Sequence, residues 1–251
     1  MDQLVVALDV DSVTEAHALT ETLRGLAGGF KIGSRLFTSH GPSIVEALAG
    51  RGDRVFLDLK FHDTPNTVAG AVAAATRLGA WMLNVHASGG LAMMRAARDA
   101  ASEEAARMSR PVPIVVAVTM LTSLNQQMLA EIGLHEAMAS QVERLAALAQ
   151  AAGLDGVVAS PQETALIRMR CGKEFKIVTP GIRGGGAIGA ERVQRAGVRA
   201  GSDDQQRTMT APEALAAGAS YLVVGRPIIA APDPRAAAER LVAECRASQM
   251  P

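Results

Sequence analysis

The sequence predicts an α/β protein of the (β/α)8 TIM-barrel class, formed as a single domain over residues 1–251. Short apolar runs alternate with alanine-rich amphipathic stretches along the whole chain, and no linker, repeat or low-complexity tract divides it. The apolar runs carry almost no charge except near their ends. Eight β-then-α units in about 250 residues suit a closed barrel. An open, doubly wound sheet is the alternative, because the number of strands alone does not prove closure.

The expected strands are rich in β-branched residues and nearly continuous in apolarity, as strands buried on both faces should be. They are 4–9, 30–33, 55–60, 82–86, 114–121, 156–160, 176–180 and 221–225. Helices are expected between them. Capping-box patterns predict three helix starts, at Ser12–Glu15, Ser160–Glu163 and Thr210–Glu213. Glycines at 28–29, 79 and 153 lie where helices are expected to end.

Composition narrows the class of protein. The 25 basic and 25 acidic residues balance, so neither nucleic acid nor a membrane surface is the expected partner. Cys171 and Cys245 are the only cysteines, which disfavours a disulfide scaffold and suits a reducing compartment. The N-terminus lacks the basic start of a signal peptide, and no apolar run is long enough to span a bilayer. We therefore expect a cytoplasmic protein.

Polar side chains gather at the carboxyl ends of the expected strands, which is where barrels place their chemistry. This grouping favours a functional site at the mouth of the barrel, formed by these strand ends, over a set of unrelated ion pairs. The residues are Asp9, Lys31, Asp58, Lys60, Thr119, Thr122, Arg183 and Arg226.

The segment Asp58–Thr67 carries the densest charge pattern. Asp58 and Lys60 should point the same way because side chains alternate along a strand. Taken alone, this pattern is more often a structural ion pair. Lys31, one strand over, supplies a second positive charge, and flanking carboxylates should keep Lys60 protonated. A protonated lysine beside a carboxylate can stabilise a carbanion and donate a proton to it.

Arg183 and Arg226 follow the seventh and eighth strands beside glycine and proline, where barrels commonly bind phosphate. The formal G-x-G-x-x-G at Gly184–Gly189 is not expected to bind a dinucleotide, because no second strand precedes Asp203 and Asp204. The five histidines lack metal-ligand spacing, so no metal is expected. Of these histidines, only His86 ends a strand, and a packed core role is the expectation for it.

These segments together resemble the orotidine 5′-phosphate decarboxylases of the common bacterial type, over nearly the whole chain. The resemblance rests on motifs in a specific order: Ala7–Asp9, Phe30–Gly33, Asp58–Thr67, Thr119–Ser123, Pro180–Arg183, Asp204–Arg207 and Gly225–Ile228. It implies conversion of orotidine 5′-monophosphate to UMP and CO2 without a cofactor. It also implies a homodimer.

The resemblance further implies a role for each site residue. Lys60 would be the proton donor, in a catalytic group with Lys31, Asp58 and Asp63, and Asp63 and Thr67 would reach the neighbouring subunit's site. The substrate contacts would be Asp9 and Lys31 to the ribose, Thr122 to the pyrimidine, and Arg183, Gln205, Gly225 and Arg226 to the phosphate. An extended loop around 184–203 separates Arg183 from Gln205 and is longer than the usual lid of the family.

Two other functions stay open at this point. One is a sugar-phosphate decarboxylase or aldolase of the same superfamily, which would use magnesium. The segments Phe61–Thr67 and Asp204–Gln205 favour a nucleotide substrate instead. The other is a catalytically inactive barrel that senses a nucleotide phosphate, and the complete set of Lys31, Asp58, Lys60 and Asp63 disfavours it.

Overall fold

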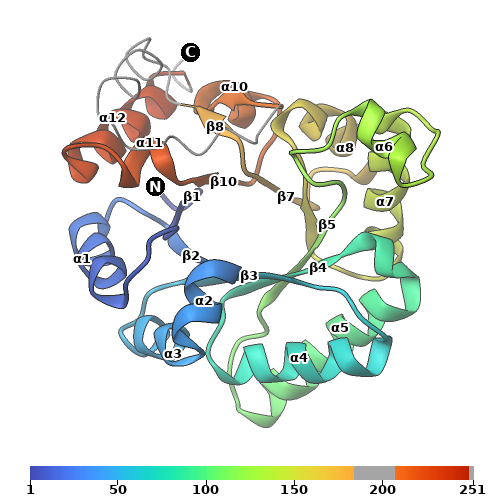
Figure 1. Cartoon of the computed structure of the whole chain (residues 1–251), viewed down its shortest axis with the longest axis horizontal. Coiled ribbons are helices and arrows are strands. Elements are labelled where there is room, and N and C mark those ends of the chain that lie inside the picture. Colours follow the sequence, from blue (N-terminus) through green and yellow to red (C-terminus); the bar gives the residue numbers. More distant parts are fainter. Residues whose placement is uncertain (184–206, 249–251) are drawn as a thin grey trace.

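The computed structural model describes residues 1–183 and 207–248, and within them eight parallel strands close a barrel (Figure 1). Because β1 pairs with both β2 and β10, the sheet closes on itself. The predicted (β/α)8 class is thus confirmed, and the doubly wound sheet is excluded. The barrel strands are β1 (Leu4–Ala7), β2 (Gly29–Gly33), β3 (Val55–Phe61), β4 (Met82–His86), β5 (Ile114–Val118), β6 (Gly156–Val158), β7 (Lys176–Thr179) and β10 (Tyr221–Val224).

Helices surround this ring of strands (Figure 1). On α4, the buried Val68, Val72 and Ala75 recur at helical spacing and face the barrel. None of the helices in the described ranges is long and apolar enough to cross a membrane. The helical elements are α1 (Val13–Leu23), α2 (Ser34–His40), α3 (Ser43–Gly50), α4 (Pro65–Arg77), η1 (Ala87–Gly89), α5 (Gly90–Arg107), α6 (Gln126–Glu131), α7 (Met138–Ala151), η2 (Pro161–Glu163), α8 (Thr164–Cys171), α10 (Ala211–Ala216), α11 (Arg226–Ile229) and α12 (Pro234–Ala247).

The cap patterns predict most helix boundaries well. Ser12 caps α1, and complete capping boxes form at Ser160 and Thr210, although the Ser160 box starts the short η2 turn that leads into α8. The expectation that Gly28–Gly29 ends a helix is wrong, since α1 ends at Leu23. A Cβ on Gly28 would lie 2.2 Å from the carbonyl oxygen of Asp2, so that glycine is needed for close packing of the chain start.

Apolar side chains fill both faces of the barrel sheet. On β1, Val5 and Ala7 join a cluster with Phe56 and Met82 inside the barrel. The alternate residues, including Leu4 and Val6, belong to the larger cluster under the helices. Burial of both faces of each strand explains why the strands appear in the sequence as continuous apolar runs.

β3 departs from regular pairing at its carboxyl end. Leu57 pairs with Leu83, but the next paired residues are Phe61 and Val85, so four steps along β3 match two along β4. Lys60 lies in this bulge with φ of +52°, a left-handed conformation that is uncommon outside glycine. Bulges of this kind re-aim side chains next to active sites.

A short parallel pair was not predicted from the sequence. β8 (Ile182–Arg183) pairs with β9 (Met209–Thr210), which sets Arg183 opposite Thr210. Each strand has only two residues, too few for an apolar pattern to show.

Candidate active site

Four charged side chains form a row at the carboxyl ends of β1, β2 and β3. The Lys31 ammonium lies 3.1 Å from Asp9 Oδ1 and 3.4 Å from Asp58 Oδ2. The Lys60 ammonium donates a hydrogen bond of 2.6 Å to Asp58 Oδ1. Negative and positive groups therefore alternate from Asp9 through Lys31 and Asp58 to Lys60. We call these four residues the charge row.

Burial and the neighbouring charges shift the pKa values of Lys31 and Asp58 in opposite directions. The side chains of Lys31 and Asp58 are only 11% and 13% exposed. Burial alone would neutralise each group, but the neighbouring opposite charges outweigh it. As a result, Asp58 and Asp9 raise the pKa of Lys31, and Lys31 and Lys60 lower the pKa of Asp58. Both groups are charged at neutral pH, and the Lys60 side chain is 35% exposed at the end of the row.

Asn84 is the residue of this site that the sequence reasoning missed. It is completely buried on β4, and its amide donates a 2.7 Å hydrogen bond to Asp58 Oδ1. Its carbonyl oxygen accepts a 2.8 Å hydrogen bond from the backbone N–H of Lys60. One side chain thus holds Asp58 and also replaces the strand partner that the bulge denies to Lys60. The polar Asn84 inside the otherwise apolar run 82–85 was the signal available in the sequence.

Glycine 33 makes room for the charge row. A Cβ at this position would lie 3.0 Å from Lys31 Nζ and 3.5 Å from Asp9 Oδ1. Gly225 approaches the same row from β10, since a Cβ there would lie 3.5 Å from Asp9 Oδ2. The end of β10, expected to bind phosphate, is therefore adjacent to the expected ribose contact.

Asp63 and Thr67 lie apart from the charge row of their own chain. Both are exposed at the start of α4. Asp63 Oδ1 accepts a 2.6 Å hydrogen bond from the backbone N–H of Thr64, and the Thr64 and Thr67 hydroxyl oxygens are 3.1 Å apart. Among the described residues, Asp63 forms no ion pair with Lys60. The structure thus brings together Lys31, Asp58 and Lys60, but not Asp63.

The remaining expected contacts come from the other side of the barrel mouth. Arg183 and Arg226 are exposed, at the end of β8 and the start of α11. Thr122 is half-buried just beyond β5, which ends at Val118 rather than at the expected 121. Gln205 and the long loop 184–203 lie outside the described residues.

His86 has a more specific place than the packed core role expected for it. It is half-buried at the end of β4, with its ring 5.4 Å from that of His62. Burial, followed by the charges of His62 and Lys60, lowers the pKa of His86, so the imidazole is neutral at neutral pH. Within residues 1–183 and 207–248, no three His, Cys, Asp or Glu side chains are placed to hold a metal ion.

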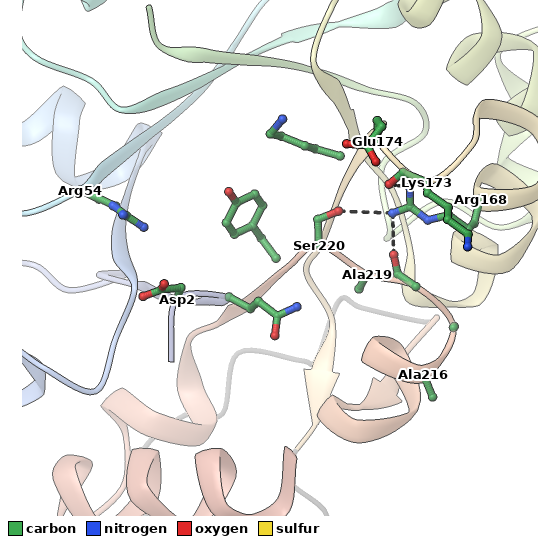
Figure 2. Close-up of a pocket in the computed structure, with 13 residues that line it drawn as sticks. Asp2, Arg54, Arg168, Lys173, Glu174, Ala216, Ala219 and Ser220 are labelled. Carbon is green, nitrogen blue, oxygen red and sulfur yellow. Dashed lines mark hydrogen bonds between the residues drawn. The ribbon is translucent and has the colours of Figure 1, made fainter. Parts of the chain in front are cut away.

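One hollow of the described structure lies at the opposite end of the barrel (Figure 2). It has a volume of about 740 Å³, and its lining includes Asp2, Arg54, Lys176 and Tyr221, which precede or begin strands. The amino ends of barrel strands generally serve stability rather than catalysis. Arg168 illustrates this role, because it donates to the Gly218 carbonyl and the Ser220 hydroxyl there (Figure 2).

A closed parallel barrel with buried opposite charges at the carboxyl ends of its strands is the arrangement of barrel enzymes, a class of proteins whose chemistry lies at that mouth. The particular family follows from comparison with known proteins. The chain belongs to the orotidine 5′-phosphate decarboxylase / HUMPS family, whose family model matches residues 2–241.

Individual relatives agree with this assignment. The orotidine 5′-phosphate decarboxylase of Moorella thermoacetica is 53% identical over 246 residues, which cover 97% of this chain and 92% of that protein. The protein of the same name from Syntrophotalea carbinolica is 49% identical, over 98% of this chain and 96% of its own. The crystal structure of orotidine 5′-phosphate decarboxylase from Lactobacillus acidophilus superposes with a TM-score of 0.80 at 35% identity, covering 96% of this chain and 98% of that one. The chain is accordingly a carbon–carbon lyase of the decarboxylase type.

Proposed function

We propose that this protein decarboxylates orotidine 5′-monophosphate to UMP and CO2 in pyrimidine biosynthesis, without a cofactor, and that Lys60 protonates the C6 carbanion. The observation that carries the proposal is the charge row of Asp9, Lys31, Asp58 and Lys60, held at the mouth of the barrel. The names of the relatives support the substrate and the pathway.

The reaction needs a positively charged group close to C6 of the pyrimidine. The C6–carboxylate bond breaks, CO2 leaves, and the electron pair stays on C6 as a vinyl carbanion. The Lys60 ammonium stabilises this charge and then transfers a proton to C6, after which Lys60 regains a proton from water. Asp58 holds that ammonium at 2.6 Å and faces the departing carboxylate.

The rest of the mouth binds the nucleotide. Asp9 is about half exposed and Lys31 is next to it, which suits contacts to ribose hydroxyls. Thr122 binds the pyrimidine. The phosphate contacts are Arg183, Gln205, Gly225 and Arg226, of which the two arginines supply planar donor forks. Binding of this distant phosphate can contribute to catalysis at C6 as well as to affinity.

The active protein is a homodimer in this proposal. Asp63 and Thr67 are exposed and separate from the charge row of their own chain, which supports a role in the partner's site. Mixing Lys60→Ala subunits with Asp63→Ala subunits should restore part of the activity, because one site of each mixed dimer is then intact. Absence of any rescue would contradict shared sites. The proposal also takes residues 1–251 as one domain in the cytoplasm.

The test of the function is direct. Purified protein is incubated with orotidine 5′-monophosphate in the presence of EDTA, and the loss of orotate absorbance is followed. We expect turnover, with UMP as the product. No turnover would contradict the proposal, and turnover only after magnesium is restored would favour the sugar-phosphate branch of the family. Binding of UMP without any turnover would instead indicate a nucleotide sensor.

A further inference from the structure

Arg207 connects three segments that are far apart in the sequence. Its Nη2 donates a 3.0 Å hydrogen bond to the carbonyl oxygen of Leu121, which directly precedes Thr122. Its Nη1 pairs with the carboxylate of Glu163 in η2. Its own carbonyl oxygen accepts a 3.2 Å hydrogen bond from the Ser160 hydroxyl. Arg207 thereby joins the chain beyond β5, the chain beyond β6 and the chain that enters β9.

The partner of Arg207 is itself held in place. Glu163 Oε2 accepts a 3.1 Å hydrogen bond from the backbone N–H of Ser160, as the second half of the capping box. The side chains of Arg207 and Glu163 are only 12% and 8% exposed. A buried ion pair costs desolvation and seldom adds net stability, so stability alone is a weak explanation for it.

The location of Arg207 links the two sides of the proposed substrate site. It lies two residues before β9, and β9 pairs with β8 so that Thr210 is opposite Arg183. Thr122, on the other side, is the proposed pyrimidine contact, while Arg183 is a proposed phosphate contact. The hydrogen bond from Arg207 to Leu121 is a direct connection between these two segments.

We propose that Arg207 is a positioning residue for decarboxylation, which holds the Leu121–Thr122 backbone at a set spacing from the β8–β9 pair. This inference rests on the proposed function. A nucleotide that spans the mouth meets Thr122 at its base and Arg183 at its phosphate, so this spacing determines whether both contacts form together. Arginine suits the task because its planar fork reaches Glu163 and the Leu121 carbonyl at once, whereas lysine offers a single ammonium.

The test is a double-mutant cycle on kcat/KM with orotidine 5′-monophosphate. Arg207→Lys should lower kcat/KM by about tenfold, the size of one lost hydrogen bond from a charged donor. In a Thr122→Val background, the same substitution should lower it by less than about threefold, because the contact that Arg207 positions is already gone. Urea unfolding of each variant checks that the protein is folded.

Arg168→Met, at the other end of the barrel, is the matched control. Its effect on kcat/KM should be the same with and without Thr122→Val, within about twofold. Additive losses for Arg207→Lys and Thr122→Val would overturn the inference, as would unchanged activity of Arg207→Lys. Inactive wild-type protein would overturn the proposed function and this inference together, whereas additivity in an active enzyme overturns only the inference.

Discussion

The contact of Asn84 with both Asp58 and Lys60 makes the Asn84→Ala substitution a sharp test of how the charge row is held. The substitution removes the 2.7 Å hydrogen bond to Asp58 Oδ1 and the 2.8 Å hydrogen bond from the Lys60 backbone. It leaves the part-buried N–H of Lys60 without its acceptor, in a residue that already holds a left-handed conformation. Without these two hydrogen bonds, the bulge no longer fixes the direction of the Lys60 side chain toward the barrel mouth.

The magnitude follows from these two bonds. A hydrogen bond to a charged group contributes about 1.5–3 kcal/mol, and one between neutral groups about 1 kcal/mol. The total of about 3 kcal/mol divides between folding and catalysis. We therefore expect the free energy of unfolding to fall by about 2 kcal/mol and kcat to fall at least about tenfold. KM should change little, because Asn84 reaches the substrate only through Asp58 and Lys60.

The assay combines urea unfolding with the orotate absorbance assay. Thr179→Val is the matched control, because Thr179 is equally buried on β7 and donates a 3.2 Å hydrogen bond to the Tyr221 carbonyl, away from the charge row. The control should lose stability but keep kcat. If Asn84→Ala and Thr179→Val lose stability alike and both keep full kcat, the reasoning about Asn84 is refuted.

Three further predictions concern charge, stability and space. The lowered pKa of Asp58 stabilises the fold fully above its ordinary pKa of 3.8, and this stability is lost as pH falls through the folded pKa of Asp58. The raised pKa of Lys31 stabilises the fold fully below its ordinary pKa of 10.5, and this stability is lost as pH rises through the folded pKa of Lys31. Urea unfolding measured against pH should show both losses. Arg168→Met should lower the free energy of unfolding by about 3 kcal/mol without changing kcat, because this guanidinium donates to several backbone carbonyls at the amino end of the barrel. Gly33→Ala should lower kcat about tenfold with little loss of stability, because the new Cβ displaces the Lys31 ammonium.

Each of these predictions has a clear contradicting outcome. A Lys31→Met/Asp58→Asn variant with the same pH profile of stability as wild type would show that these groups do not set it. Wild-type stability of Arg168→Met would mean that water replaces its carbonyl contacts without cost. Unchanged kcat in Gly33→Ala would mean that Lys31 tolerates displacement.

The fold was predictable because its strands are buried on both faces. Continuous apolar runs mark such strands, and every expected barrel strand is present, with ends that differ by at most three residues. The β8–β9 pair was not predictable, because two-residue strands leave no periodic pattern. Gly28–Gly29 misled the helix-end prediction because these glycines serve close packing, Gly28 against Asp2 and Gly29 against Arg54, rather than a helix terminus.

The site was predictable in residue type but not in geometry. Strand alternation correctly suggested that Asp58 and Lys60 share a face, but the actual approach depends on a bulge whose register is set by β4. The role of Asn84 depends on the same bulge, so the polarity of Asn84 within an apolar run marks the residue but does not predict its contacts. Asp9, expected only as a ribose contact, pairs directly with Lys31. The place of Asp63 outside the row follows from the turn into α4, where Asp63 binds the Thr64 backbone.

The role of Lys60 as proton donor is tested most directly by the Lys60→Ala variant. The measurement compares turnover of orotidine 5′-monophosphate with calorimetric binding of UMP in the wild type and the variant. Loss of the proton donor should lower kcat by at least about a thousandfold, while UMP binding is retained, because the ribose, base and phosphate contacts remain. A Lys60→Ala variant that decarboxylates at a rate close to wild type would contradict the assignment of Lys60 as the proton donor.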